Sequence, residues 1–354
     1  MRHYCTYFDS GFLCQGLALS RSLLAREPSS VLWVLALDTE CERVLGLLRE
    51  PNLRIVGLSA VEADDPELAA AKANRSRVEY YFTLSPVWPR WLLKRYPEIE
   101  QITYVDADMA LFGSLDPVFQ AMDEARASVL VTAHRFPSWL TAYERHGRFN
   151  VGILSWRRTP AGIACLDRWR GECLTWCYDR LEADRYADQK YLDAWPAALG
   201  NDLCVLEHAG VNYAPWNWRS CPWIVGRDGR VGVGGMPLLL FHAARFRPLL
   251  GTIWWQSGHL DYGVMPFRLR NAIYGPYARL LMEARATVRT IRPGFDFPRR
   301  SARLGRSYLQ GLFLRLVAGS DWLRVGPLFF GARAGLGRYS GQVLQMLRRT
   351  RLRA

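Results

Sequence analysis

The tract Ile102-Thr103-Tyr104-Val105-Asp106-Ala107-Asp108-Met109-Ala110-Leu111-Phe112 places two aspartates, one residue apart, between apolar segments. Carboxylates flanked by apolar residues are costly to bury unless a cation or strong hydrogen-bond donors satisfy them. In an extended chain, residues i and i+2 face the same side, so both carboxylates can bind one divalent cation. The spacing alone is also explained by a helix N-cap or a solvated turn, since chance gives about one Asp-x-Asp in such a chain. The position at the end of an apolar strand favours a metal site.

Strand-like and helix-like segments alternate around this tract through the first part of the chain. Such alternation predicts an α/β fold, in which helices cover a mostly parallel sheet and ligands bind at the carboxyl ends of its strands. No Gly-x-Gly-x-x-Gly follows the first strand and no P-loop motif occurs, so a dinucleotide site or a P-loop NTPase is unsupported. The predicted strands are His3–Phe8, Ser30–Leu37, Leu53–Leu58, Ile102–Val105 and Ser128–Thr132, and the predicted helices are Cys14–Arg26, Cys41–Arg49, Ser76–Tyr96 and Pro117–Ala125.

Proline and glycine residues predict bends and turns within this pattern. Pro86 and Pro89 are expected to bend or interrupt the helix Ser76–Tyr96. Asp228-Gly229 predicts the turn of a hairpin between Trp223 and Val233. Further along the chain, the pattern predicts a strand at Phe149–Trp156, a helix at Pro160–Tyr178, a short helix at Asp188–Leu199 and a last buried strand at Leu238–Phe241.

Length and composition indicate a large folded protein. The chain has 354 residues, and half of them are hydrophobic, so a sizeable core is expected. No segment approaches the roughly 18 apolar residues of a membrane span, and the N-terminus runs directly into a predicted strand. We therefore expect a cytoplasmic protein, in which the eight cysteines are buried, reduced thiols.

Positive charge is concentrated at the C-terminal end. Residues 267–354 contain 18 Arg, no Lys and three acidic residues, so they carry +15, whereas residues 1–266 carry −2. We expect residues 1–260 to form the main domain and residues 261–354 a basic, helical C-terminal region. This region is predicted either to dock on an anionic membrane surface or to pack on the main domain with solvated arginines. Nucleic acid is not expected, because no recognised nucleic-acid-binding motif occurs. An apolar stripe at helical spacing comprises Leu309, Leu312, Phe313, Leu316 and Val317.

Several short motifs, in this order and spacing, resemble the family 8-like glycosyltransferases of GT-A fold over about residues 1–250. The Asp106-Ala107-Asp108 tract resembles their DxD motif, and the segment His242–Pro248 resembles their HxxGxxK motif, with Arg245 at the glycine position and Pro248 at the lysine position. The other matching segments are Ser76–Tyr81, Phe149–Leu154, Ala187–Asp193 and Leu240-Phe241-His242.

The resemblance implies a metal-dependent enzyme that moves a sugar from a nucleotide-diphosphate donor, a UDP-sugar, to a cell-surface glycan or lipid-linked acceptor with retention. By the same resemblance, Asp106, Asp108 and His242 bind Mn²⁺ or Mg²⁺. Asp188 binds the donor sugar and Gln189 lies near its anomeric carbon, as the catalytic pair. The residues implied in donor binding are Thr6, Asp9, Arg77, Asn150 and Arg247.

Each of these residues also has a purely structural interpretation. His242 alone is explained as a core histidine after a buried strand, Asp188 as the N-cap of the following helix and Asn150 as an edge-strand amide. Five tryptophans can stack on an acceptor sugar or belong to the core, namely Trp216, Trp218, Trp223, Trp254 and Trp255. The alternative for the whole chain is a non-catalytic basic protein that binds membrane or nucleic acid through residues 267–354. A sugar-phosphate nucleotidylyltransferase is disfavoured, because the first strand is followed by Phe8-Asp9-Ser10-Gly11-Phe12 without the Gly-rich, basic loop such enzymes need.

Overall fold

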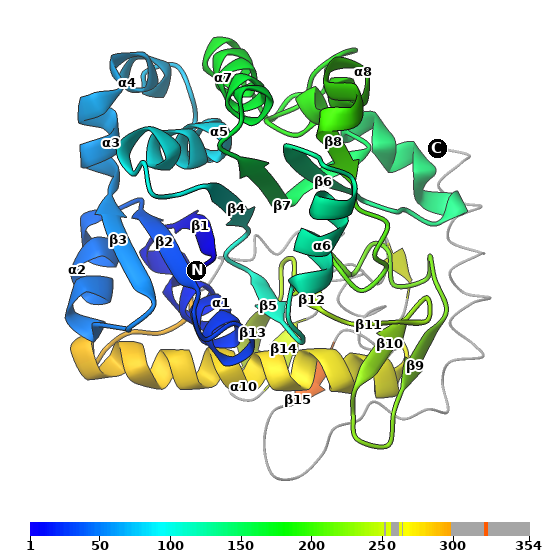
Figure 1. The fold of residues 1–354 in the computed structure, drawn as a ribbon. Helices are drawn as coiled ribbons and strands as arrows, with labels where there is room; N and C mark the ends of the chain where they lie inside the picture. The colour runs from blue at the N-terminus through cyan, green and yellow to red at the C-terminus, as the bar shows by residue number, and fades with distance from the viewer. Residues whose placement is uncertain (251–252, 256–261, 264, 299–321, 325–354) are drawn as a thin grey trace, which may run out of the picture.

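The computed structural model describes residues 1–250, 253–255, 262–263, 265–298 and 322–324. Its centre is a seven-stranded sheet with the strand order β3-β2-β1-β4-β7-β6-β8 (Figure 1). Neighbouring strands are parallel except at β7, which runs antiparallel to both β4 and β6. The predicted α/β class and mostly parallel sheet are confirmed. The strands are β1 (His3–Phe8), β2 (Val31–Ala36), β3 (Leu53–Gly57), β4 (Gln101–Val105), β6 (Val129–Ala133), β7 (Phe149–Arg157) and β8 (Leu203–Val205).

Each face of the sheet carries its own hydrophobic core, because alternate residues of a strand point to opposite faces. In β1, Tyr4 and Phe8 belong to one core, whereas Cys5 belongs to the other. The first core is covered by α1 (Leu13–Arg26), α2 (Thr39–Leu48), α6 (Asp116–Glu124) and α10 (Phe267–Ile291), and the second chiefly by α5 (Arg77–Arg95) and α7 (Pro160–Thr175).

Shorter elements fill the connections between these layers. The pair β5 and β12 forms a separate two-stranded sheet, and β9, β10 and β11 form a three-stranded one that contains the predicted hairpin. These elements are η1 (Ser10–Phe12), α3 (Leu58–Asp64), α4 (Pro66–Lys72), β5 (Met109–Leu111), η2 (Ser138–His146), η3 (Lys190–Ala194), α8 (Trp195–Leu199), η4 (Gly200–Asp202), β9 (Trp223–Val225), β10 (Val231–Val233), β11 (Met236–Pro237), β12 (Leu240–His242), β13 (Arg247–Leu250), β14 (Ile253–Trp255) and β15 (Trp322–Arg324).

Helix α5 is not interrupted by its two prolines. It begins at a capping box, in which the Ser76 hydroxyl accepts from the Glu79 N–H and the Glu79 carboxylate accepts from the Ser76 N–H. Pro86 and Pro89 then lie inside the continuous helix and are buried. Packing against the sheet therefore outweighs the cost of the missing N–H groups, and the predicted interruption at this point is wrong.

Helix α10 packs along α1 on the first face of the sheet (Figure 1). Its buried residues Ile273, Tyr277 and Leu281 belong to the same core as Tyr4 of β1. The beginning of the basic C-terminal region thus contributes to the core of the main domain. The apolar stripe predicted at 309–317 lies outside the described residues. Among the described helices, none combines the length and hydropathy that a bilayer-spanning segment needs.

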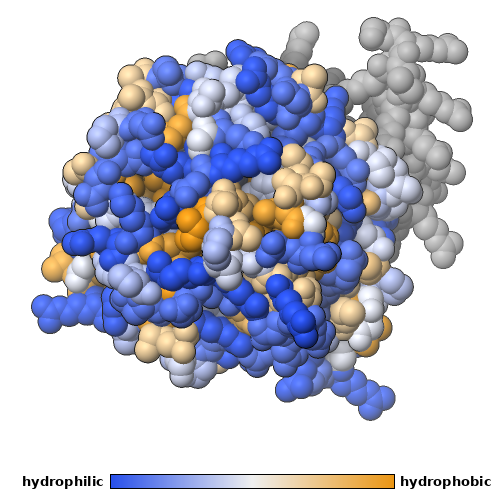
Figure 2. Space-filling view, turned by 45° about the horizontal axis from the view of Figure 1, so that its top comes forward, coloured by the Kyte–Doolittle hydropathy of each residue, from blue (hydrophilic) through white to orange (hydrophobic). Residues whose placement is uncertain are grey.

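The surface and the cysteines agree with a folded, reduced protein. Seven of the cysteines are buried, Cys221 is partly buried, and all eight are free thiols. The face shown in Figure 2 is mostly hydrophilic, with apolar residues gathered toward its centre.

Candidate active site

Acidic side chains follow three neighbouring parallel strands at the same edge of the sheet. Asp9 follows β1, Asp38 follows β2 and Asp106 follows β4. Asp38 caps α2, since its carboxylate accepts from the Cys41 N–H at 2.7 Å, and it also accepts from the Ser10 hydroxyl at 2.9 Å. Asp106 has no such capping role, so its carboxylate is available for other chemistry at this carboxyl edge.

Asp106, Asp108 and His242 come together as the resemblance implied. Their ligand atoms all lie within 4.8 Å of one another. The His242 Nε2 atom is 3.1 Å from Asp108 Oδ1 and 3.6 Å from Asp106 Oδ2. The Asp106 and Asp108 side chains are 30% and 22% exposed, whereas the His242 side chain is 8% exposed, so the cluster opens to solvent on its carboxylate side.

Backbone pairing carries His242 to the two aspartates from 134 residues further along the chain. Strand β12 runs antiparallel to β5, so that His242 is opposite Met109, the residue after Asp108. The Ala243 N–H donates to the Asp108 carbonyl at 3.0 Å, and the His242 N–H donates to the Tyr213 carbonyl at 2.8 Å. These bonds fix the imidazole beside the carboxylates.

Gly152 of β7 forms the floor beneath His242. A Cβ atom at this position would lie 2.9 Å from His242 Nδ1 and 2.5 Å from Met109 Cε, so a larger residue cannot fit without moving them. The Gly152 carbonyl also accepts from the Asp106 N–H at 2.9 Å. The Phe149–Leu154 motif therefore supports the cluster of Asp106, Asp108 and His242.

The donor set and its electrostatics fit a divalent cation. Burial raises the pKa of Asp106, the carboxylate of Asp108 adds to this, and His242 opposes it. Burial disfavours the charged form of His242, but the carboxylates of Asp108 and Asp106 outweigh it and raise the histidine pKa. Crowded anionic oxygens of this kind gain most from a cation, and two carboxylates with one imidazole suit a hard to borderline ion. The Tyr104 hydroxyl donates to Asp106 Oδ1 at 2.7 Å and holds this carboxylate in place.

Asp188 lies near this cluster, but it is not the helix cap that its position suggested. The side chain does not cap the following helix, since η3 begins after Gln189 without a side-chain cap. Instead, its Oδ2 accepts from the Ser85 hydroxyl of α5 at 2.6 Å, and the Ser85 oxygen is 2.9 Å from the Tyr7 hydroxyl. Burial raises the pKa of Asp188 to about 7, the negative charge of Asp106 adds to the rise, and the Ser85 bond opposes it. Asp188 therefore changes its charge close to neutral pH.

Gln189 is held by the segment that follows β6. Its Nε2 donates to the carbonyl of His146, the last residue of η2, at 3.0 Å. A Cβ atom on Gly147 would lie 3.2 Å from Gln189 Cγ, so these two segments of the chain are in close contact. Gln189 follows Asp188 directly in the chain. Its side chain is partly exposed and is tethered by the bond to His146.

Asp9 and Arg77 meet at the end of β1. The Arg77 guanidinium donates to Asp9 Oδ2 at 2.5 Å and to the Tyr81 hydroxyl at 2.7 Å. The Arg77 side chain is 67% exposed, so it can still reach an anionic ligand. Thr6, by contrast, is 0% exposed, and a direct contact between its side chain and a donor is not supported.

Asn150 is also buried, because β7 lies between β4 and β6 and is not an edge strand. Its Oδ1 accepts from the Gly152 N–H and from Asn212 Nδ2, both at 2.9 Å, and its Nδ2 is 3.2 Å from His134 Nε2. The expected contact of Asn150 with sugar or phosphate is therefore not supported. Asn150 instead shapes the floor of the site, together with Asn212 and His134, which the sequence did not single out.

The segment after His242 contains a residue in the left-handed region of the backbone. Arg245, at the family's glycine position, has a φ of 62°, which lies in the left-handed region that glycine adopts most easily. Arg247 begins β13, where it pairs with Trp255 of β14. Trp216 and Trp218 are buried, at 7% and 5% exposed, so they belong to the core and not to an acceptor platform.

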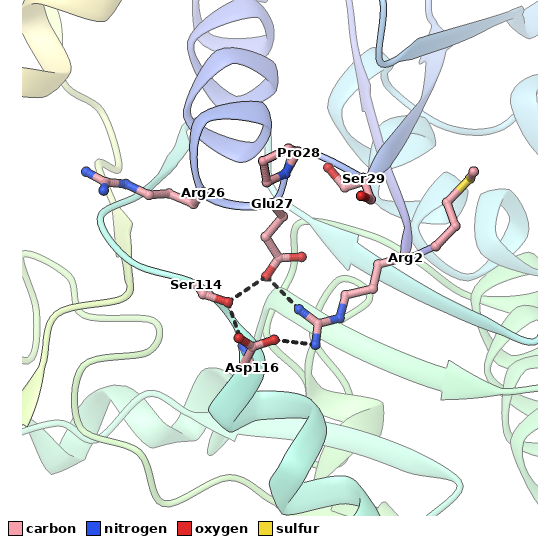
Figure 3. Close-up of a pocket in the computed structure, with 9 residues that line it drawn as sticks. Arg2, Arg26, Glu27, Pro28, Ser29, Ser114 and Asp116 are labelled. Carbon is pink, nitrogen blue, oxygen red and sulfur yellow. Dashed lines mark hydrogen bonds and ion pairs between the residues drawn. The ribbon is translucent and has the colours of Figure 1, made fainter.

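A pocket lies at the amino end of β1, away from the candidate site, and is lined by paired charges (Figure 3). The buried Glu27 carboxylate accepts from Arg2 at 3.0 Å, from the Tyr4 hydroxyl at 2.5 Å and from the Leu115 N–H at 2.8 Å. Arg2 also donates to Asp116 at 2.5 Å. Because these groups satisfy one another, this pocket ties the start of β1 to α6 and is a structural feature.

Comparison with known proteins places the chain in a family. No model of a known protein family matches it. The chain is 30% identical over 256 residues to the uncharacterized protein YfnF of Bacillus subtilis strain 168, and this match covers 69% of the chain and 81% of YfnF. The chain therefore belongs to the same family as YfnF.

Solved structures similar to the chain are glycosyltransferases. They include the galactosyltransferase LgtC in complex with donor and acceptor sugar analogues, with a TM-score of 0.45, 14% identity, and coverage of 79% of this chain and 95% of LgtC. They also include mouse xyloside xylosyltransferase 1, with a TM-score of 0.41, 15% identity, and coverage of 60% and 87%. The reaction of this chain has to be inferred from the residues of its own site.

Proposed function

We propose that the chain is a metal-dependent glycosyltransferase that transfers a sugar from a nucleotide-diphosphate donor, a UDP-sugar, to a glycan or lipid-linked acceptor with retention. The observation that carries the proposal is the convergence of Asp106, Asp108 and His242 within 4.8 Å at the carboxyl edge of the sheet. The sequence resemblance to family 8-like enzymes supplies the donor class.

These three residues would hold Mn²⁺ or Mg²⁺. When bound, the cation supplies Lewis-acid stabilisation of the negative charge on the departing diphosphate. Tyr104 orients the Asp106 carboxylate for this purpose, and Gly152 leaves room for the imidazole. Arg77 adds an exposed positive charge near the end of β1, where it can pair with a phosphate oxygen.

Asp188 and Gln189 serve the sugar side of the reaction. Sugar transfer develops positive charge at the anomeric carbon, and a nearby carboxylate stabilises that charge. With a pKa of about 7, the Asp188 carboxylate is available as an anion at and above neutral pH. Ser85 and Tyr7 hold its orientation, and the tethered Gln189 amide offers a polar group on the same segment.

The test measures hydrolysis of UDP-sugars and GDP-sugars by the full chain, with Mn²⁺ and with EDTA. A thermal-shift panel of the same nucleotides identifies the donor first. Asp106→Asn and Asp108→Asn should abolish metal-stimulated hydrolysis while the protein stays folded. Asp228→Asn, in the exposed hairpin turn, serves as the control and should behave as wild type. Full activity of either active-site variant would refute the metal role.

A further part of this proposal is that the protein lies in the cytoplasm and docks on the inner face of the membrane through its Arg-rich C-terminal region. It is supported by the +15 charge of residues 267–354. Binding to vesicles with anionic lipid should weaken as salt rises. A non-catalytic basic protein would show this binding and no turnover of any nucleotide sugar.

A further inference from the structure

Exposed aromatic rings gather on the segment after β6. Trp139 and Tyr143 of η2 are 48% and 37% exposed, although large rings are normally buried. Phe136 precedes η2 and His146 ends it, and both are partly exposed. These four residues are called the aromatic surface below.

Ring contacts connect the aromatic surface to the metal cluster. The His242 ring centroid is 5.0 Å from that of Trp216, and Trp216 is 5.7 Å from His134. His134 stacks on Phe136 at 4.8 Å, and Phe136 is 5.9 Å from Tyr143. Phe136 and Tyr143 are thus the outer end of a packed series that begins at His242, and this fixes their position relative to the cluster.

The same segment also holds Gln189. The carbonyl of His146 accepts from the Gln189 amide at 3.0 Å, and the His146 ring is 4.8 Å from the ring of Tyr186. The His146 end of the aromatic surface is therefore next to the residue that we place near the anomeric carbon.

Polar groups border the rings. The Arg219 guanidinium lies over Trp139, 5.6 Å from its ring centroid, and over Trp218 at 4.8 Å. Arg145, in the last turn of η2, is exposed. Exposed aromatic rings with guanidinium donors close by match a pyranose, which has C–H groups on its face and hydroxyl groups at its edge.

We infer that the aromatic surface binds a sugar ring of the glycan acceptor by stacking it on Trp139 and Tyr143. This inference rests on the proposed glycosyltransferase function and adds where the acceptor lies. The rings proposed to stack on the acceptor, Trp139 and Tyr143, were not singled out in the sequence, and they replace the buried Trp216 and Trp218 in this role.

The test uses saturation-transfer difference NMR on the full chain with Mg²⁺ and no donor. The probes are the methyl glycosides of β-galactose, β-glucose, α-mannose and N-acetyl-β-glucosamine. At least one should receive saturation on its ring protons from the wild-type protein. Trp139→Ala combined with Tyr143→Ala should weaken its binding about tenfold or more, and Trp139→Phe should retain most of it. Phe267→Ala is the control, because Phe267 is similarly exposed (41%) on α10.

The inference is overturned if no probe receives saturation from the wild type, or if binding is unchanged in the double alanine variant. Thermal shift by UDP with Mn²⁺ is measured on the same variants. Loss of the UDP shift with unchanged sugar binding would mean that the surface holds the donor base, and it also overturns the inference. If sugar binding follows the rings but no nucleotide sugar is turned over, the surface stands and the proposed transferase function fails.

Discussion

The buried Asp188 carboxyl should make the stability of this protein fall as pH rises. Its pKa is about 7 in the folded chain, against an ordinary value of 3.8. Between these values the folded state keeps a proton that the unfolded state has lost, so raising the pH favours unfolding. Asp188→Asn mimics the neutral acid and can still accept the Ser85 hydrogen bond. From pH 5 to pH 8, the wild type should lose about 2–3 kcal/mol of unfolding free energy relative to this variant.

The assay is urea unfolding followed by tryptophan fluorescence in EDTA, at half-unit steps from pH 5 to pH 8. The difference between the two proteins isolates Asp188, because every other titrating group is common to both. Asp228→Asn, on an exposed turn with a 59% exposed side chain, is the matched control and should run parallel to the wild type. Parallel curves for the wild type and Asp188→Asn would mean that the pKa of Asp188 is not raised in the folded protein. Its assigned role at the sugar would then lose its physical basis.

Three further substitutions test the surroundings of the site. Ser85→Ala removes the donor that lowers the pKa of Asp188, so the acidic limb of the pH–rate profile should move to higher pH, and an unmoved limb would contradict the role of this bond. Tyr104→Phe should weaken Mn²⁺ binding by roughly tenfold in calorimetric titration while the melting temperature changes little, and unchanged affinity would show that the hydroxyl is dispensable. Gly152→Ala should destabilise the fold by about 1–3 kcal/mol and weaken Mn²⁺ binding, whereas Gly171→Ala, where a Cβ has open space, should do neither.

The positions of the first strands of the main sheet could be predicted because each of them has a clear local signal. β2 is buried along its whole length, and its sequence is a continuous apolar run. Helices α3 and α4 were missed, since each has only seven residues and too few apolar positions to show a helical period. The pairing of β5 with β12 was also missed, because three-residue strands depend on a partner that lies far away in the sequence.

In the candidate site too, local features could be predicted and features that depend on distant segments could not. The acidic pair after β4 and the order of the motifs were visible in the sequence, and they were enough to name the three residues that the fold brings together. The burial of Thr6 and Asn150 could not be predicted, because it depends on which strands lie beside them, and β7 proved to be central.

The sequence by itself determined the α/β class, the basic C-terminal region and the residues able to bind a cation, because apolar periodicity, charge and ligand chemistry are local properties of the chain. Only the tertiary structure decided that His242 reaches the two aspartates, that Ser85 holds Asp188 and that Trp139 stays exposed. Each of these depends on contacts between segments distant in the chain, and such contacts are settled by packing across the whole fold.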